Sequence, residues 1–164
     1  MRFRFEQSVP VSRETVFGFF ENPQRIALLH EGWSRIRLLR CENQIRVGAE
    51  LWVEVTLAGF IPMVLGFQHF LFEPPNRFGE KAIHGPFSRF VHIHDFVIKD
   101  GETVVRDLLE VRLPGYYGGA AGMKHIIAPG LSRMFYGRAQ ALDRLVRSGA
   151  LACYGPGAVT ATEG

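Results

Sequence analysis

The sequence predicts an α+β domain in which one antiparallel β-sheet is covered by a long amphipathic helix. Between residues 35 and 113 the chain divides into short segments of alternating apolar and polar residues separated by turn residues, which is typical of antiparallel strands. From residue 131 the apolar residues change to a helical period. The length of 164 residues favours one domain, so we expect these elements to share a core.

The N-terminal part predicts one strand followed directly by two short helices. Residues 2–9, RFRFEQSV, alternate Phe with Arg and Glu, which indicates a strand. In the following VSRETVFGFF, Ser12 is a good N-cap for a helix that presents an apolar face. Pro23 suits the first turn of a second short helix, PQRIALLH.

Six further strands are expected at residues 35–42, 50–57, 64–73, 77–84, 87–98 and 103–113. The sequence KDG at 99–101 is a strong hairpin turn between the last two. The uncharged segment 55–72 has 18 residues, the length of a transmembrane helix. Gly59 and Pro62 interrupt it and both halves are rich in β-branched and aromatic residues, so a β-hairpin is the preferred interpretation.

The C-terminal part predicts a long helix that ends near residue 148. Its apolar face is formed by Leu131, Met134, Phe135, Leu142, Leu145 and Val146. The glycine-rich segment 115–130 before it is expected to be a surface loop, with a lid over a pocket as the alternative. Residues 149–164 are small and nearly uncharged, so we expect a domain at 1–148 and a flexible tail at 149–164.

Composition excludes some classes of function. The net charge is only +3 and the chain has no run of Lys or Arg, so we expect no nucleic-acid partner. No secretion signal is visible, and Cys41 and Cys153 have no CxxC spacing, so a cytoplasmic protein with reduced thiols is expected. The 14 Phe residues indicate an apolar cavity or a large contact surface.

Three blocks of sequence carry a resemblance to a known superfamily. They are PPNRFGEKAIHGPFSRFVHIHDF (74–96), GETVVRDLLEVRLPG (101–115) and FYGRAQAL (135–142). With the order of elements, they resemble the START-like or SRPBCC superfamily, which includes polyketide cyclase-like and ligand-binding proteins. Phe90 stands where the family usually has Trp, and Gly137 where it has Tyr.

The resemblance implies the helix-grip fold: a curved antiparallel sheet of about seven strands, two short helices after the first strand, and a long C-terminal helix across the sheet. It also implies a cavity for an apolar or amphipathic molecule, without a metal or other cofactor. It implies no particular reaction, because the fold hosts both carriers and enzymes.

Strand alternation predicts which side chains line that cavity. His92 and His94 share a face of their strand, and Glu80 and His84 share a face of the preceding one. Arg138 falls inside the apolar stripe of the long helix. The candidate ligand-binding residues are Phe78, Glu80, Phe90, His92, His94, Phe96, Asp107, Leu109, Phe135 and Arg138.

The HxH pair of His92 and His94 has several interpretations. The preferred one is a cavity wall in which the imidazoles hydrogen-bond to Asp107 or Glu80. Binding of a ligand's polar head together with Arg138 comes second, and acid–base chemistry third. Metal binding comes last, because the spacing lacks any zinc-site pattern, and we expect no metal. We expect a structural role for His30 and assign none to His69.

Three functions remain open at this point. The preferred hypothesis is binding or transport of a hydrophobic or amphipathic small molecule, such as a lipid, isoprenoid or polyketide-like compound. The first alternative is a cyclase-like or aromatase-like enzyme with His92, His94, Asp107 and Glu80 as candidate catalytic residues. The second alternative is an interaction module that forms a homodimer through the outer face of the sheet.

Overall fold

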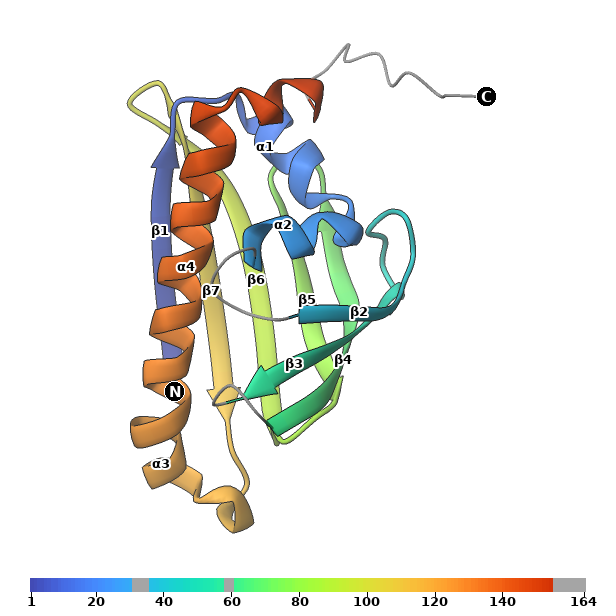
Figure 1. Ribbon diagram of the computed structural model, residues 1–164, viewed down its shortest axis with the longest axis vertical. Coiled ribbons are helices and arrows are strands. Elements are labelled where there is room, and N and C mark those ends of the chain that lie inside the picture. Colours follow the sequence, from blue (N-terminus) through green and yellow to red (C-terminus); the bar gives the residue numbers. More distant parts are fainter. Residues whose placement is uncertain (31–35, 58–60, 155–164) are drawn as a thin grey trace.

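The computed structural model describes residues 1–30, 36–57 and 61–154. Within these residues, seven strands form one antiparallel sheet in the order β1-β7-β6-β5-β4-β3-β2. The strands are β1 (Arg2–Val9), β2 (Ile36–Cys41), β3 (Glu50–Leu57), β4 (Ile61–Glu73), β5 (Arg77–His84), β6 (Arg89–Lys99) and β7 (Glu102–Arg112). The predicted fold class, a curved sheet with short N-terminal helices and a long C-terminal helix, is confirmed (Figure 1).

Helices cover one face of this sheet. In Figure 1, α4 runs along β1 and β7, while α1 and α2 lie over the upper part of the same face. The helical segments are α1 (Arg13–Phe20), the 3-10 helix η1 (Pro23–Arg25), α2 (Ile26–His30), the 3-10 helix η2 (Gly115–Tyr117), α3 (Gly119–Gly122), the π-helical segment η3 (Met123–Ile127), α4 (Ala128–Arg147) and the 3-10 helix η4 (Ala150–Tyr154).

The segment from residue 115 to 130 corrects the sequence analysis. A loop was expected there, but the chain is helical through η2, α3 and η3 and continues into α4, which begins at Ala128. Packing overrides the weak helix propensity of its glycines, because Met123 is buried in the core beside Leu113. Gly122 is also needed for close approach, since a Cβ there would lie 2.6 Å from the carbonyl oxygen of Tyr117.

The uncharged segment 55–72 contributes to strands, as the hairpin interpretation predicts. β3 and β4 pair antiparallel from Glu50 with Gln68 to Leu57 with Ile61. Residues 58–60, in the predicted turn, lie outside the described residues. Among the described residues, no helix is long and apolar enough to cross a membrane.

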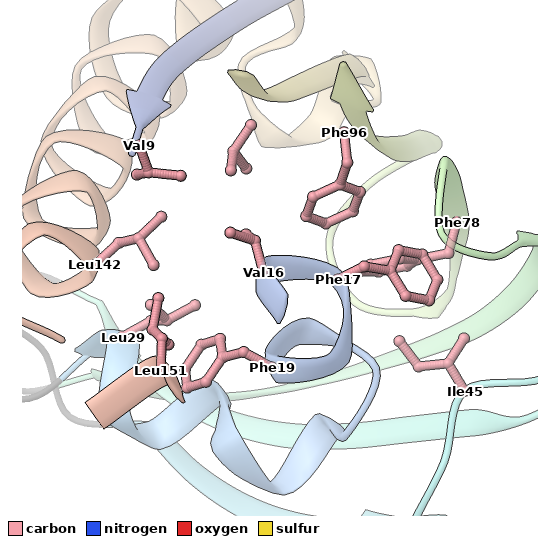
Figure 2. Close-up of a cluster of buried hydrophobic side chains, with 11 residues drawn as sticks. Val9, Val16, Phe17, Phe19, Leu29, Ile45, Phe78, Phe96, Leu142 and Leu151 are labelled. Atoms are coloured by element: carbon pink, nitrogen blue, oxygen red, sulfur yellow. The ribbon is translucent and has the colours of Figure 1, made fainter. Parts of the chain in front are cut away.

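Helix α1 supplies much of the core. Val16, Phe17 and Phe19 project from it into a buried cluster that includes Phe96 of β6 and Leu142 of α4 (Figure 2). The ring of Phe17 meets that of Phe96 edge to face at 5.3 Å between centroids. This packing holds α1 against the sheet.

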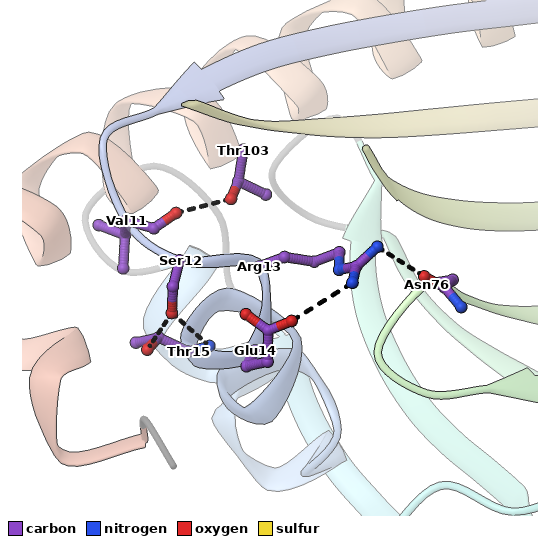
Figure 3. A network of polar contacts seen from close by, with 7 residues as sticks. All are labelled: Val11, Ser12, Arg13, Glu14, Thr15, Asn76 and Thr103. Carbon is purple, nitrogen blue, oxygen red and sulfur yellow. Dashed lines mark hydrogen bonds and ion pairs between the residues drawn. The ribbon is translucent and has the colours of Figure 1, made fainter. Parts of the chain in front are cut away.

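Polar contacts hold the entry to α1. The predicted N-cap is correct, because Ser12 Oγ accepts a hydrogen bond from the backbone N–H of Thr15 (Figure 3). Thr103 donates its hydroxyl to the carbonyl oxygen of Val11, and Arg13 donates to Asn76 (Figure 3). The link between β1 and α1 is thereby tied to β7 and to the β4–β5 turn.

The residues after α4 are only partly described. η4 lies within the segment expected to be a tail, and its Leu151 is 1% exposed in the same core cluster as Phe19. Residues 155–164 lie outside the described residues, so the flexible tail stays a prediction for them. Cys41 and Cys153 are both free thiols.

Candidate functional site

A buried polar cluster lies on three consecutive strands of the sheet. Glu80 of β5 is the cross-strand partner of His92 on β6, and His94 is the partner of Asp107 on β7. The alternation of β6 turns both imidazoles inward, as predicted, and both are about 95% buried. The structure therefore brings together Glu80, His92, His94 and Asp107, four of the polar residues that the sequence analysis placed in the cavity wall.

His92 is held between two carboxylates. Its Nε2–H donates to Oδ1 of Asp107 at 2.8 Å. Its other nitrogen, Nδ1, lies 3.4 Å from Oε1 of Glu80. Because a carboxylate can only accept, the bond to Asp107 places a proton on Nε2.

His94 lies beside His92, with 3.9 Å between the ring centroids. Its Nδ1 is 2.8 Å from Oδ1 of Asp107, but the two atoms are not aligned for a hydrogen bond. This buried nitrogen therefore has no hydrogen-bond partner among the described residues. The ring of Phe78 stacks on His94 at 4.3 Å between centroids.

Arg138 approaches the cluster from α4, as its place in the apolar stripe predicts. Its guanidinium lies 3.6 Å from Oδ1 of Asp107 and 4.9 Å from the centre of the Phe135 ring. It makes no other ion pair and no hydrogen bond with the residues that the structure describes. A mostly buried guanidinium with free donors is therefore available beside Asp107.

The sequence analysis assigned no role to His69, which is part of this cluster. Its Nδ1–H donates to the carbonyl oxygen of Ala49 at 3.2 Å, and its Nε2 lies 3.7 Å from Oε2 of Glu80. The signal for an inward side chain was its alternation with Gln68 and Phe70. Its approach to Glu80 also depends on a register shift between His69 and Leu71, which the sequence did not indicate.

The charges of the cluster are strongly coupled. Burial alone would raise the pKa of Asp107, but Arg138 and the two imidazoles outweigh it and hold this pKa well below its usual value. Burial also opposes ionisation of Glu80, yet contact with His92 lowers the pKa of Glu80 to about 2. Both carboxyl groups are therefore ionised at neutral pH.

The two histidines differ in charge preference. Burial would lower the pKa of His92, but its contacts with Asp107 and Glu80 outweigh burial and raise it. For His94, burial and then the positive charge of His92 lower the pKa to about 4. The two imidazoles consequently cannot both carry a proton easily.

A pocket of about 420 Å³ opens between β1 and α4 and reaches this cluster. It is lined by Arg4, Phe5, Glu6, Gln7, Phe20, Leu29, Val105, Asp107, Ser132, Phe135, Tyr136, Arg138, Ala139 and Leu142. Asp107 and Arg138 are the polar groups that it shares with the cluster. Gln7 ties its two sides together by donating from Nε2 to the carbonyl oxygen of Ala139 at 2.9 Å.

The predicted ligand-binding residues fall into two groups. Asp107, Phe135 and Arg138 line the pocket. The others are not among the lining residues and belong to the polar cluster or to the hydrophobic core, and these are Phe78, Glu80, Phe90, His92, His94, Phe96 and Leu109. The expected place of His84 in the wall is wrong, because it lies beyond the register shift between Gly66 and Phe67 and is exposed beside Trp52.

Solved structures show the same fold, although no known family profile and no curated protein matches the sequence. Protein Ms6760 from Mycobacterium smegmatis has a TM-score of 0.69 at 10% identity, over 90% of this chain and 92% of its own. Ara h 8.0201 has a TM-score of 0.67 at 11% sequence identity, over 90% of this chain and 98% of its own. An AHSA1-like protein from Aeromonas hydrophila has a TM-score of 0.64 at 17% sequence identity, over 92% of this chain and 95% of its own. These likenesses identify the helix-grip fold.

Proposed function

We propose that this chain is a ligand-binding member of the START-like or SRPBCC superfamily that holds an amphipathic small molecule with an anionic head. The observation that carries the proposal is the pocket between β1 and α4, whose apolar walls lead to the mostly buried guanidinium of Arg138 with its free donors. The sequence resemblance and the helix-grip fold support this assignment. Such a pocket suits a molecule that is apolar along most of its length.

The walls of the pocket supply the apolar part of the site. Phe5 of β1 stacks on Phe135 of α4 at 4.2 Å between ring centroids, and Phe20 and Leu142 continue the wall inward. Burying an alkyl or isoprenoid chain against these side chains contributes about 25 cal/mol per Å² of apolar surface. This contribution is large enough to bind a chain but not to select its head group.

Arg138 supplies that selection. Asp107 already receives the hydrogen bond from His92, and its 3.6 Å separation from Arg138 leaves the guanidinium without an aligned acceptor among the described residues. A planar carboxylate or a phosphate could accept two hydrogen bonds from such a fork. The head of the ligand would then lie against Arg138 with its chain toward Phe5.

Catalysis is less well supported than binding. His92 and His94 are not among the residues that line the pocket, and Asp107 lies between them and the space a substrate would occupy. A cyclase-like reaction would have to use Asp107, which the cluster keeps ionised, as the group nearest the substrate. Binding requires no such proton transfer.

A binding assay with pocket variants tests the proposal. Protein purified under native conditions would be titrated with a fluorescent fatty acid, and saturated carboxylates and alcohols of several chain lengths would compete for the site. Ser132→Trp places an indole at the rim of the pocket and should weaken binding by tenfold or more. Gln140→Trp, on an exposed position of the same helix outside the pocket lining, is the matched control.

The outcome is decisive in both directions. Saturable binding that Ser132→Trp weakens and Gln140→Trp spares would support the pocket as the site. Absence of binding across the panel, together with no co-purified molecule in native mass spectrometry, would contradict the proposal. A homodimer through the outer sheet face stays a separate prediction, which light scattering tests.

A further inference from the structure

We propose that Glu80, His92 and His94 form a binding site for one divalent transition-metal ion. Each of these residues offers a ligand atom, and the three atoms lie within 4.8 Å of one another. Two imidazoles and one carboxylate are a donor set suited to Zn²⁺, Co²⁺, Fe²⁺ or Ni²⁺ rather than to Ca²⁺ or Mg²⁺. The sequence analysis ranked metal binding last, because the HxH spacing lacks a zinc-site pattern and the family resemblance implies no metal, although Glu80 or Asp107 was a possible third ligand.

The hydrogen bond of His92 presents the correct nitrogen. Since Nε2–H donates to Asp107, the neutral form of His92 would direct the lone pair of Nδ1 toward Glu80. A carboxylate that orients a metal-binding imidazole through its other nitrogen is the usual second layer of such sites. Asp107 is therefore placed to orient a metal-binding His92.

The separation of donor atoms fits a shared ion. Nδ1 of His92 and Oε1 of Glu80 are 3.4 Å apart, which is long for a hydrogen bond. Neighbouring ligands of one metal ion, with bonds of about 2.0–2.2 Å, lie roughly 3.0–3.5 Å apart. When His92 is neutral, both atoms are acceptors, and they repel each other at this distance unless a metal ion or a proton lies between them.

His94 provides an independent observation. Its buried Nδ1 lies 2.8 Å from Oδ1 of Asp107 but makes no aligned hydrogen bond with the described residues. A buried imidazole nitrogen without an aligned hydrogen bond is destabilising, and a metal ion would remove the need for that bond. Its stacking on Phe78 fixes the ring in this position.

The charge balance also calls for a cation. With neutral imidazoles, Glu80 and Asp107 contribute two negative charges against the one positive charge of Arg138. The second oxygen of Glu80 lies 3.7 Å from Nε2 of His69, which is too far for a hydrogen bond. The missing charge is either a proton on His92 or a metal ion, and these two possibilities can be separated experimentally.

The first measurement uses the full chain without a polyhistidine tag. After dialysis against EDTA, the protein would be titrated near neutral pH with Co²⁺, whose visible absorption reports ligands from the protein, and then with Zn²⁺ as competitor. We expect one Co²⁺ per chain, displaced by Zn²⁺ with a rise in melting temperature. A proton held by His92 would be released on binding and would be detected by a pH indicator.

Variants assign the ion to these residues. Glu80→Gln and His94→Gln should each weaken Co²⁺ binding by tenfold or more, whereas His84→Gln, which removes an exposed imidazole outside the cluster, should leave it unchanged. Circular dichroism would confirm that each variant is folded.

Two results would overturn the proposal. One is wild-type protein that shows no ligand-field absorption and no stoichiometric binding of either ion, a result that depends on no variant. The other is Co²⁺ binding that folded Glu80→Gln retains in full. Neither result bears on the pocket assay, so the two proposals can fail separately.

Discussion

His94 of β6 and Asp107 of β7 are direct cross-strand partners. Asp107 nevertheless accepts its aligned hydrogen bond from His92, which precedes His94 by two residues on β6. One carboxylate therefore contacts both imidazoles and also lies 3.6 Å from Arg138 of α4. Asp107 links the sheet to the helix and the polar cluster to the pocket. The consequences can be measured.

Replacing Asp107 by Asn should lower the free energy of unfolding by about 3–5 kcal/mol. The change removes the counter-charge of a buried group and leaves Arg138 unpaired, which is the costly way to break a buried ion pair. Urea unfolding measures the loss. Glu110→Gln is the control on the same strand, because its pair with Arg89 is partly exposed and should contribute at most about 1 kcal/mol. Equal losses would show that Asp107 is not specially placed.

Replacing Arg138 by Gln should weaken binding of a fatty carboxylate by about tenfold or more, since a charge-assisted hydrogen bond contributes about 1.5–3 kcal/mol. Binding of the alcohol of the same chain length should change little. Competition titrations give both values. Arg133→Gln, an exposed arginine on the same helix, should affect neither. If carboxylate and alcohol weaken together, Arg138 supports the pocket wall and does not select the head.

His30 should make the protein less stable in acid. Burial, and then the charge of Arg138, lowers the pKa of His30 from 6.5 to about 4. Between these pH values the unfolded chain binds a proton that the folded chain does not, so the free energy of unfolding falls as the pH falls, by up to about 3 kcal/mol. Above pH 6.5 this contribution is constant.

Urea titrations at several pH values test this effect. His30→Gln should reduce the slope of the stability profile between pH 6.5 and about 4 and leave the part that His94 contributes, while His125→Gln, at an exposed position, should keep the slope of the wild type. If the free energy of unfolding of His30→Gln falls with pH as steeply as that of the wild type, groups other than His30 cause the acid sensitivity.

Gly18 should tolerate no side chain. A Cβ at this position in α1 would lie 2.6 Å from the carbonyl oxygen of Tyr154 in η4, so Gly18→Ala should cost about 1–3 kcal/mol in urea unfolding. Gly130→Ala is the matched helical control, with no neighbouring atom within 4 Å, and should stabilise the fold by up to about 1 kcal/mol. A gain in both variants would contradict the packing of η4 on α1.

The sequence was sufficient to predict the faces of β6 and β7. Alternation is a local property of an extended strand, so Phe90, His92, His94 and Phe96 share one face of β6 whatever its register with the neighbouring strands. The amphipathic stripe of α4 is equally local and correctly places Arg138 against the core. These two patterns were enough to assemble most of the polar cluster.

Features that depend on non-local packing could not be predicted. The position of His69 beside Glu80, and the exposure of His84, follow from two register shifts between β4 and β5 that leave no mark in the sequence. The helical course of residues 115–130 depends on burial of Met123. The location of the pocket required the spacing between β1 and α4, which no periodicity gives.

The order of the strands along the chain has a consequence for how the protein assembles. β5, β6 and β7 are consecutive, so the bond from His92 to Asp107 joins residues only 15 positions apart. The bond from Gln7 to Ala139, across the pocket, spans 132 positions. Contacts between residues far apart in the chain form more slowly, because closing a long loop costs more entropy. We therefore expect the sheet of β5, β6 and β7 to form early and the pocket last. A chain stalled between these steps would hold His92 and His94 together before the pocket between β1 and α4 exists.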